Sequence, residues 1–249
     1  MITKEFRSGG YAYLPGVFQY SAGVAALSGF EIVRVAFRKP PPLREGFSRA
    51  EEIIKAVGRP VTAFCACELR SPGQFSEPAF RSFNESYVET LDRWGLIVEG
   101  ANPVARSNVC PEISPPTEPV MYAFSYVVPA QAVTTPTFII AGSGEVPEGK
   151  PNYRDHIVSP GDLSPAGMRS KVRFVRQEME RRMAGFGRSW NDVTAAQAYS
   201  IRDFHDCLAD ELITFGAAAH GLIWHYCRPP IVGLDFEMDC RGVSRELVV

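Results

Sequence analysis

Two acidic residues near the C-terminus and one arginine in mid-chain are the side chains of this 249-residue sequence best suited to chemistry. Asp235 and Glu237 stand two positions apart in the segment R228-PPIVGLDFEMD-239, which predicts a strand with both carboxylates on one face. A carboxyl group held in place can orient a water molecule and carry its proton. Arg106, in V104-ARS-107, is a planar cation that can give two parallel hydrogen bonds to a carboxylate. These residue types therefore suit binding of a carboxylate and transfer of a proton.

Two of the candidate residues also have plainer interpretations. Arg106 could pair at the surface with Glu99 or Glu112. His220, in G216-AAAHG-221, titrates near neutrality and could bind a carboxylate or carry a proton. It could equally be a single polar side chain at the start of a strand, so the sequence leaves both possibilities open.

A long loop follows the strand predicted at 137–145 and extends to residue 165, and long loops in compact domains are often functional. Gly142 and Gly144 would let a ligand approach the backbone closely. Ser143 and Glu145 would then end the strand at the mouth of a site, which makes both of them candidate binding residues.

The elements that must position these residues occur twice along the chain. Each copy has a strand, a helix, a strand, a second helix and closing strands. In the first copy we expect them at 30–37, 45–57, 61–69, 78–94, 104–110 and 120–128. In the second copy we expect them at 137–145, 168–183 and 187–200, then in another helical stretch and at 228–239. The proline-containing segment 128–137 predicts a division into domains 1–129 and 130–249.

This order of elements predicts an α+β fold in which each domain has a mixed sheet with two helices on one face. The other face of each sheet would be free and would have to be covered. Assembly of several chains into a ring is one way to cover it.

Composition excludes several other classes of protein. The chain is 45% hydrophobic and 22% charged with a formal net charge of -2, which gives no electrostatic footprint for nucleic acid. The densest basic run, R169-SKVRFVRQEMERR-182, is interleaved with glutamates, and we expect an exposed helix face. No apolar stretch approaches the length of a membrane span, and the first ten residues lack a signal-peptide core. We expect a cytoplasmic protein with six reduced cysteines and no metal-binding motif.

Several short motifs resemble the RidA/YjgF family. F83-NESY-87 is similar to the family's Asn-x-x-Tyr on the second helix, and V104-ARS-107 to its Pro-Ala-Arg-Ser. F138-IIAGSGEVP-147 and R228-PPIVGLDFEMD-239 resemble its first and closing strands. The resemblance covers nearly the whole chain as two tandem domains. It implies a chorismate-mutase-like fold, trimers, and hydrolysis of imines and enamines of small carboxylates without metal or organic cofactor.

The resemblance also implies roles for individual residues. Arg106 would bind the substrate carboxylate, Asn84 would be the helix asparagine, and Asp235 would match the catalytic Glu with Glu237 as the second acid. Each copy nevertheless departs from the pattern. Met121 stands near the position of the first copy's acid. In the second copy, His220 replaces the arginine and Leu208 replaces the helix asparagine.

Each copy therefore holds half of the motif. A site that joined Arg106 with Asp235 would need the two copies to dock unusually, so we expect one copy to keep a modified site, or neither to act.

A weaker similarity links the chain to chorismatases, which are two-domain relatives of RidA. Their Gly-Thr-Ala-Ser turn and His-x-Gly-Asp stretch have counterparts in A141-GSG-144 and H156-IVSPGD-162, although the second is also typical of a turn and helix cap. Three hypotheses follow. The first is a deaminase of a small imine or enamine carboxylate, such as an aminomuconate-like product of aromatic ring cleavage. The second is a chorismatase-like enzyme that releases pyruvate from an enolpyruvyl ether, and the third is a silent binding or scaffold protein.

Overall fold

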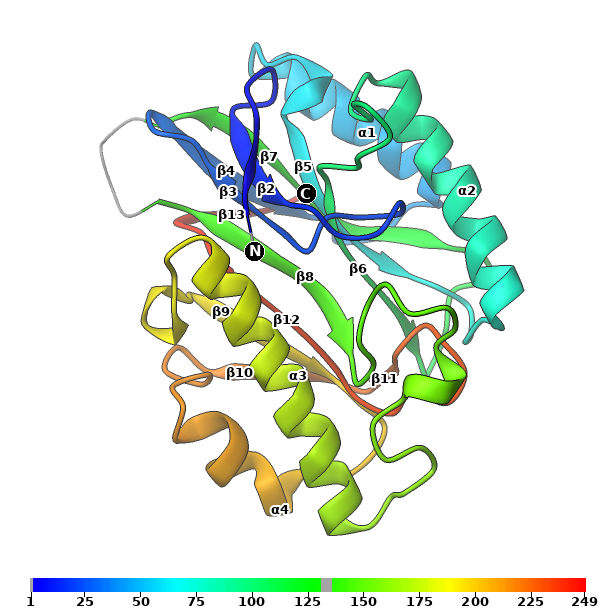
Figure 1. Ribbon diagram of the computed structural model, residues 1–249. Helices are drawn as coiled ribbons and strands as arrows, with labels where there is room; N and C mark the ends of the chain where they lie inside the picture. The colour runs from blue at the N-terminus through cyan, green and yellow to red at the C-terminus, as the bar shows by residue number, and fades with distance from the viewer. Residues whose placement is uncertain (1, 131–135) are drawn as a thin grey trace.

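The computed structural model describes residues 2–130 and 136–249 (Figure 1). The first half of the chain contains β1 (Lys4–Phe6), β2 (Tyr11–Leu14), β3 (Gly23–Ala26), β4 (Phe30–Ala36), α1 (Leu43–Ala56), β5 (Phe64–Arg70), α2 (Glu77–Arg93), β6 (Ala105–Pro111) and β7 (Val120–Pro129). The second half contains β8 (Phe138–Gly144), α3 (Pro165–Gly185), β9 (Ala195–Tyr199), α4 (His205–Leu208), β10 (Leu222–His225), β11 (Cys227–Arg228), β12 (Glu237–Gly242) and β13 (Arg245–Val248). The order of strands and helices predicted from the sequence is confirmed.

The strands form two mixed sheets, and this confirms the predicted α+β class. One sheet has the order β1-β2-β3-β8-β12-β9-β10, and the other has the order β11-β6-β5-β7-β4-β13. The two sheets exchange strands across the expected boundary at residues 129 and 130. Strands β1 to β3 join the sheet of the second half, while β11 and β13 join that of the first half. The division into 1–129 and 130–249 stays a prediction about the repeat, because neither sheet is built from one half alone.

Helices cover the outer face of each sheet, on opposite sides of the molecule in Figure 1. Ser76 is the N-cap residue of α2, and its hydroxyl accepts a hydrogen bond from the backbone N–H of Ala79. Ser164 caps α3 in the same way. The buried faces of α1 and α2 belong to the core of the six-stranded sheet. The apolar stripe of α3, which includes Val172 and Met179, packs with Phe236 from the segment that leads into β12. Each helix therefore stabilises its sheet through an amphipathic face.

The inner faces of the two sheets meet each other through polar groups. The Ser107 hydroxyl on β6 lies 2.5 Å from an Asp239 carboxylate oxygen on β12. The Gln197 amide on β9 lies 3.4 Å from the Glu68 carboxylate on β5. One chain thus covers much of its own sheet surface, which removes the reason for expecting a ring. The homotrimer remains a prediction.

One expectation about charge is wrong. The basic run 169–182 lies on α3, but it is not simply an exposed face, because Lys171 and Arg182 have no exposed surface and Arg176 is only 5% exposed. All six cysteines are buried and unbonded, as expected. Within residues 2–130 and 136–249, no helix is long and apolar enough to cross a membrane. The same residues contain no group of three or more His, Cys, Asp or Glu placed to hold a metal ion.

Candidate active site

A small pocket lies between the two halves of the chain. Its cavity is about 40 Å³, which exceeds the roughly 10–15 Å³ that one buried water molecule needs. The first half contributes Tyr20, Phe80, Arg106 and Asn108. The second half contributes Gly142, Ser143, Gly144, Val146, Glu148, Tyr153, Pro230, Ile231, Leu234 and Glu237. Residues from the two incomplete copies of the motif therefore line one shared pocket. The sequence had predicted a site within one copy.

Arg106 is the most unusual residue of this pocket. Its guanidinium is 3% exposed and lies over the rings of Tyr87 and Tyr20, with the central carbon 4.7 and 5.4 Å from the two ring centroids. The rings of Phe80 and Phe83 also lie close to the guanidinium of Arg106. In the part of the chain that the structure describes, no side chain forms an ion pair with Arg106, and its buried Nη1 has no hydrogen-bond partner. Because buried charges are normally paired, the site suits an anion from outside the chain.

Glu237 brings an acid to the same pocket from the start of β12. The sheet register places it between Tyr199 of β9 and Gly144 of β8. A Cβ atom at Gly142 would collide with Glu237 Oε1, so a glycine is required for the carboxyl group to lie against β8. Burial, with the neighbouring charges of Asp239 and Glu145, raises the pKa of Glu237 well above its ordinary value, while Arg106 opposes the shift. This environment therefore favours the protonated, neutral form of Glu237.

Asp239, two positions further along β12, supports the acid from the inter-sheet layer. Its carboxylate accepts hydrogen bonds from the Tyr199 hydroxyl at 2.9 Å and the Gln197 amide at 2.8 Å, besides the bond from Ser107. Burial and the neighbouring Glu68 raise the pKa of Asp239. The acid pair that shares a strand face is thus Glu237 and Asp239.

The predicted pairing of Asp235 with Glu237 on one strand face is wrong, because Asp235 precedes β12. Its carboxylate bonds to Lys171 of α3 at 2.5 Å and to Arg202 at 3.1 Å, outside the pocket. Glu145 does not line the pocket either. Its carboxylate accepts the backbone N–H of Asp235 at 2.6 Å and that of Phe236 at 3.1 Å. Burial raises the pKa of Glu145 to about 7.

The other predicted residues are divided between the pocket and its surroundings. Ser143 lines the pocket and its hydroxyl accepts a hydrogen bond from Arg182 at 3.1 Å. Asn84 is buried on α2 on the helix turn between Phe80 and Tyr87, behind the lining residues. Within residues 2–130 and 136–249, both of its side-chain polar atoms lack a hydrogen-bond partner. His220 is exposed in the turn before β10 and does not reach the pocket.

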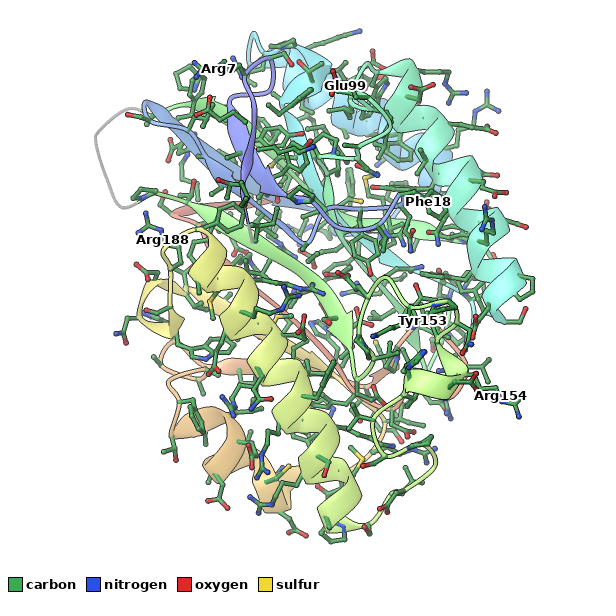
Figure 2. All side chains as sticks on the ribbon, in the orientation of Figure 1. Arg7, Phe18, Glu99, Tyr153, Arg154 and Arg188 are labelled. Carbon is green, nitrogen blue, oxygen red and sulfur yellow. The ribbon has the colours of Figure 1, made fainter. Side chains whose placement is uncertain are left out.

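The segment 156–162, which resembles a chorismatase motif, lies in the loop that leads into α3. His156 lies in a short turn at 154–156 outside the pocket lining. The Asp162 carboxylate accepts the backbone N–H of Ser164 at 2.9 Å just before α3 begins. Tyr153 from the same loop lines the pocket, whereas the next residue, Arg154, points away at the edge of the molecule in Figure 2.

Sequence reasoning missed Arg182, which has no exposed surface. Its guanidinium donates to the backbone carbonyl of Ala141 at 2.9 Å and lies 3.1 Å from a Glu148 carboxylate oxygen in the pocket wall. It therefore ties α3 to the strand and the loop that form one side of the pocket. The signal was present, because Arg182 follows the buried Val175 and Met179 by seven and three positions, which is helical spacing for one face.

The sequence and the fold were compared with those of known proteins. Residues 3–247 match the model of the 2-aminomuconate deaminase CnbZ family. A 2-amino-5-chloromuconate deaminase from Comamonas testosteroni is 49% identical over 245 residues, which are 98% of each chain. The crystal structure of a chorismatase superposes with a TM-score of 0.53 at 9% identity, over 89% of this chain and 77% of that one. A Rid-family protein of unknown function from Yersinia pestis covers 47% of this chain and 84% of its own at 16% identity, with a TM-score of 0.34.

The mixed α+β fold is similar to that of the chorismatase, and the pocket lies between the two halves of the chain. The resemblance to RidA-like proteins inferred from the motifs is confirmed. The chain belongs to the 2-aminomuconate deaminase CnbZ family.

Proposed function

We propose that this protein hydrolyses an aminomuconate-type enamine dicarboxylate, a product of aromatic ring cleavage, and releases ammonia. One observation carries the proposal: Arg106 is buried in a pocket that it shares with Glu237, and its charge has no ion-pair partner within residues 2–130 and 136–249. A substrate carboxylate would supply the missing partner through charge-assisted hydrogen bonds. The name of the Comamonas testosteroni relative, a 2-amino-5-chloromuconate deaminase, supports the choice of substrate class.

The chemistry needs a single group that gives and then takes a proton. Protonated Glu237 gives its proton to carbon of the enamine, which yields an iminium ion, and Arg106 holds the adjacent carboxylate. Water then adds to the iminium carbon while the Glu237 carboxylate takes back a proton from that water. The resulting carbinolamine transfers its hydroxyl proton to nitrogen, and the carbon–nitrogen bond breaks. One enamine and one water thus give one keto acid and one ammonia.

The remaining candidate residues have supporting tasks in this proposal. Ser143 shapes the pocket beside Arg182, and Asn84 lies buried on α2, the helix that also carries Phe80 and Tyr87. Glu145 and Asp235 fix the chain where it enters β12, and so set the position of Glu237. His220 has no contact with the pocket and takes no part in the proposed chemistry.

The test is an ammonia-release assay with an aminomuconate as substrate. We would compare the wild type with Arg106→Lys and Glu237→Gln. The exposed Arg228–Glu112 pair, 2.6 Å apart and outside the pocket, provides the matched control variants Arg228→Lys and Glu112→Gln. General acid–base catalysis is worth about 10²–10⁴-fold, so we expect Glu237→Gln to lose at least about 100-fold in rate.

Two results would count against the proposal. Full activity in both pocket variants would mean that the chemistry lies elsewhere. Absence of ammonia release by the wild type would leave the chorismatase-like hypothesis, which a pyruvate assay with an enolpyruvyl ether would then examine.

A further inference from the structure

Asn108 is a second buried and unsatisfied donor in the wall of the pocket. It lies on β6 two positions after Arg106, and both residues line the cavity. Both side chains are 3% exposed. Across the described residues, Nη1 of Arg106 and Nδ2 of Asn108 are each without a hydrogen-bond partner. Two neighbouring donors in one pocket are hard to explain as packing defects, because a buried donor left unsatisfied destabilises the protein.

Ser71 contacts the carbonyl end of the Asn108 amide. The Ser71 hydroxyl donates to Asn108 Oδ1 at 2.9 Å, and Ser71 itself has no exposed surface. The backbone of Ser71 is fixed in turn, because its N–H bonds to the carbonyl of Val109 at 2.9 Å. With the carbonyl end of the amide engaged, the NH2 end is the part of Asn108 that remains to bind a ligand.

We propose that Asn108 and Arg106 together hold one carboxylate of the substrate, each residue donating to a different oxygen atom. This inference rests on the proposed function and adds to it a specificity-determining residue. Two donors on one rigid strand fix both the position and the plane of a carboxylate. The neighbouring carbon that carries nitrogen is thereby held in one orientation towards Glu237. A ligand without a planar, doubly accepting group would leave one of the donors unsatisfied.

The experiment measures binding and turnover separately. Binding of muconate, which has the two carboxylates and lacks the amino group, is followed by calorimetry, and turnover is followed as ammonia release from an aminomuconate. The main variant is the double substitution Ser71→Ala with Asn108→Leu. It removes both partners of the Ser71–Asn108 hydrogen bond together, so neither residue is left as a buried polar group without a partner. The single variant Ser71→Ala keeps the Asn108 donor but frees its orientation. Asn191→Leu, at an exposed position outside the pocket, is the control.

We expect the double variant to fold, to bind muconate at least about 10-fold more weakly, and to lose kcat/KM by a similar factor, since a hydrogen bond to a charged group is removed. Ser71→Ala should give a smaller loss, and Asn191→Leu none. If the double variant binds muconate as the wild type does while Arg106→Lys does not, Asn108 has no part in recognition and the proposed function still stands. If the wild type neither binds muconate nor releases ammonia, both proposals fail. A lower melting temperature with unchanged muconate affinity would assign Asn108 a structural role and overturn the inference.

Discussion

Replacement of Arg106 by methionine should reduce activity strongly and leave the stability of the protein nearly unchanged. Met has a similar length and packs well against aromatic rings. The substitution removes a desolvated donor that has no hydrogen-bond partner within residues 2–130 and 136–249, and such a group destabilises by about 1–3 kcal/mol. It also removes cation–π contacts, which at a desolvated site stabilise by up to about 2 kcal/mol. The two effects nearly cancel, so we expect the free energy of unfolding to stay within about 1 kcal/mol of the wild-type value.

Arg34→Met is the matched control, because Arg34 is also a buried arginine but has partners. Its guanidinium bonds to Glu68 at 2.6 Å and to Glu246 at 3.0 Å. Burial alone would raise the pKa of Glu68, but Arg34, together with Arg241 and Arg70, lowers that pKa to about 2. Loss of Arg34 removes the two short hydrogen bonds to this buried carboxylate, and breaking a buried ion pair destabilises by about 3–5 kcal/mol.

The two variants are compared by chemical denaturation and by ammonia release. One kcal/mol corresponds to about 2–4 °C in melting temperature for a chain of this length, so thermal unfolding separates them clearly. Arg106→Met should remain near the wild type in stability and lose at least about 10-fold in kcat/KM, because a charge-assisted bond to the substrate is gone. If Arg106→Met is destabilised as much as Arg34→Met, Arg106 is a structural residue and the argument from its missing partner is refuted.

Three further predictions concern the pKa of Glu145, the glycine at position 142 and the oligomeric state. Since burial raises the folded-state pKa of Glu145 to about 7, the stability it contributes is complete below its unfolded pKa and is lost as pH rises through 7. The stability of the wild type relative to Glu145→Gln should therefore fall by about 3 kcal/mol between pH 4 and pH 8 in urea denaturation, and a flat difference would contradict the shift. Gly142→Ala should destabilise by about 1–3 kcal/mol and reduce ammonia release through displacement of Glu237, whereas Gly73→Ala, whose Cβ meets nothing within 4 Å, should do neither. Light scattering at micromolar concentration tests the homotrimer that the resemblance to the RidA/YjgF family implies, and a stable monomer would exclude it.

Local patterns predicted the elements well, because each element depends mainly on its own residues. Period-two and period-3.6 spacing of apolar residues located β4, β7 and α2, and Ser76 marks the start of α2 by its capping hydroxyl. The exchange of β1 to β3 into the other sheet could not be predicted in this way. It depends on pairing between residues more than a hundred positions apart, such as Val24 with Ile139, for which the sequence gives no local sign.

The candidate site shows the same division between local and long-range information. Arg106 and Glu237 are both predicted from their motifs, but no local pattern places them in one pocket. That arrangement depends on how two sheets dock, and the docking involves dispersed polar residues such as Ser107 and Asp239. The choice between Asp235 and Glu237 was also beyond the sequence, because it depends on whether β12 begins at residue 235 or 237 and on the position of Lys171 in α3.

The proposed site between the two halves would account for the incomplete motif in each copy. A site between the halves needs an arginine from one copy and an acid from the other, so the second arginine and the second acid are not required there. Their positions have other uses in this chain. Met121 is fully buried, and a Cβ atom at Gly46 of α1 would meet its side chain, so close packing of a helix on the sheet occupies the place expected for the first copy's acid. His220 lies in an exposed turn before β10, so an arginine at this position would not stand on a strand. The split motif is therefore consistent with one complete site per chain, assembled from both halves, and does not by itself indicate loss of chemistry.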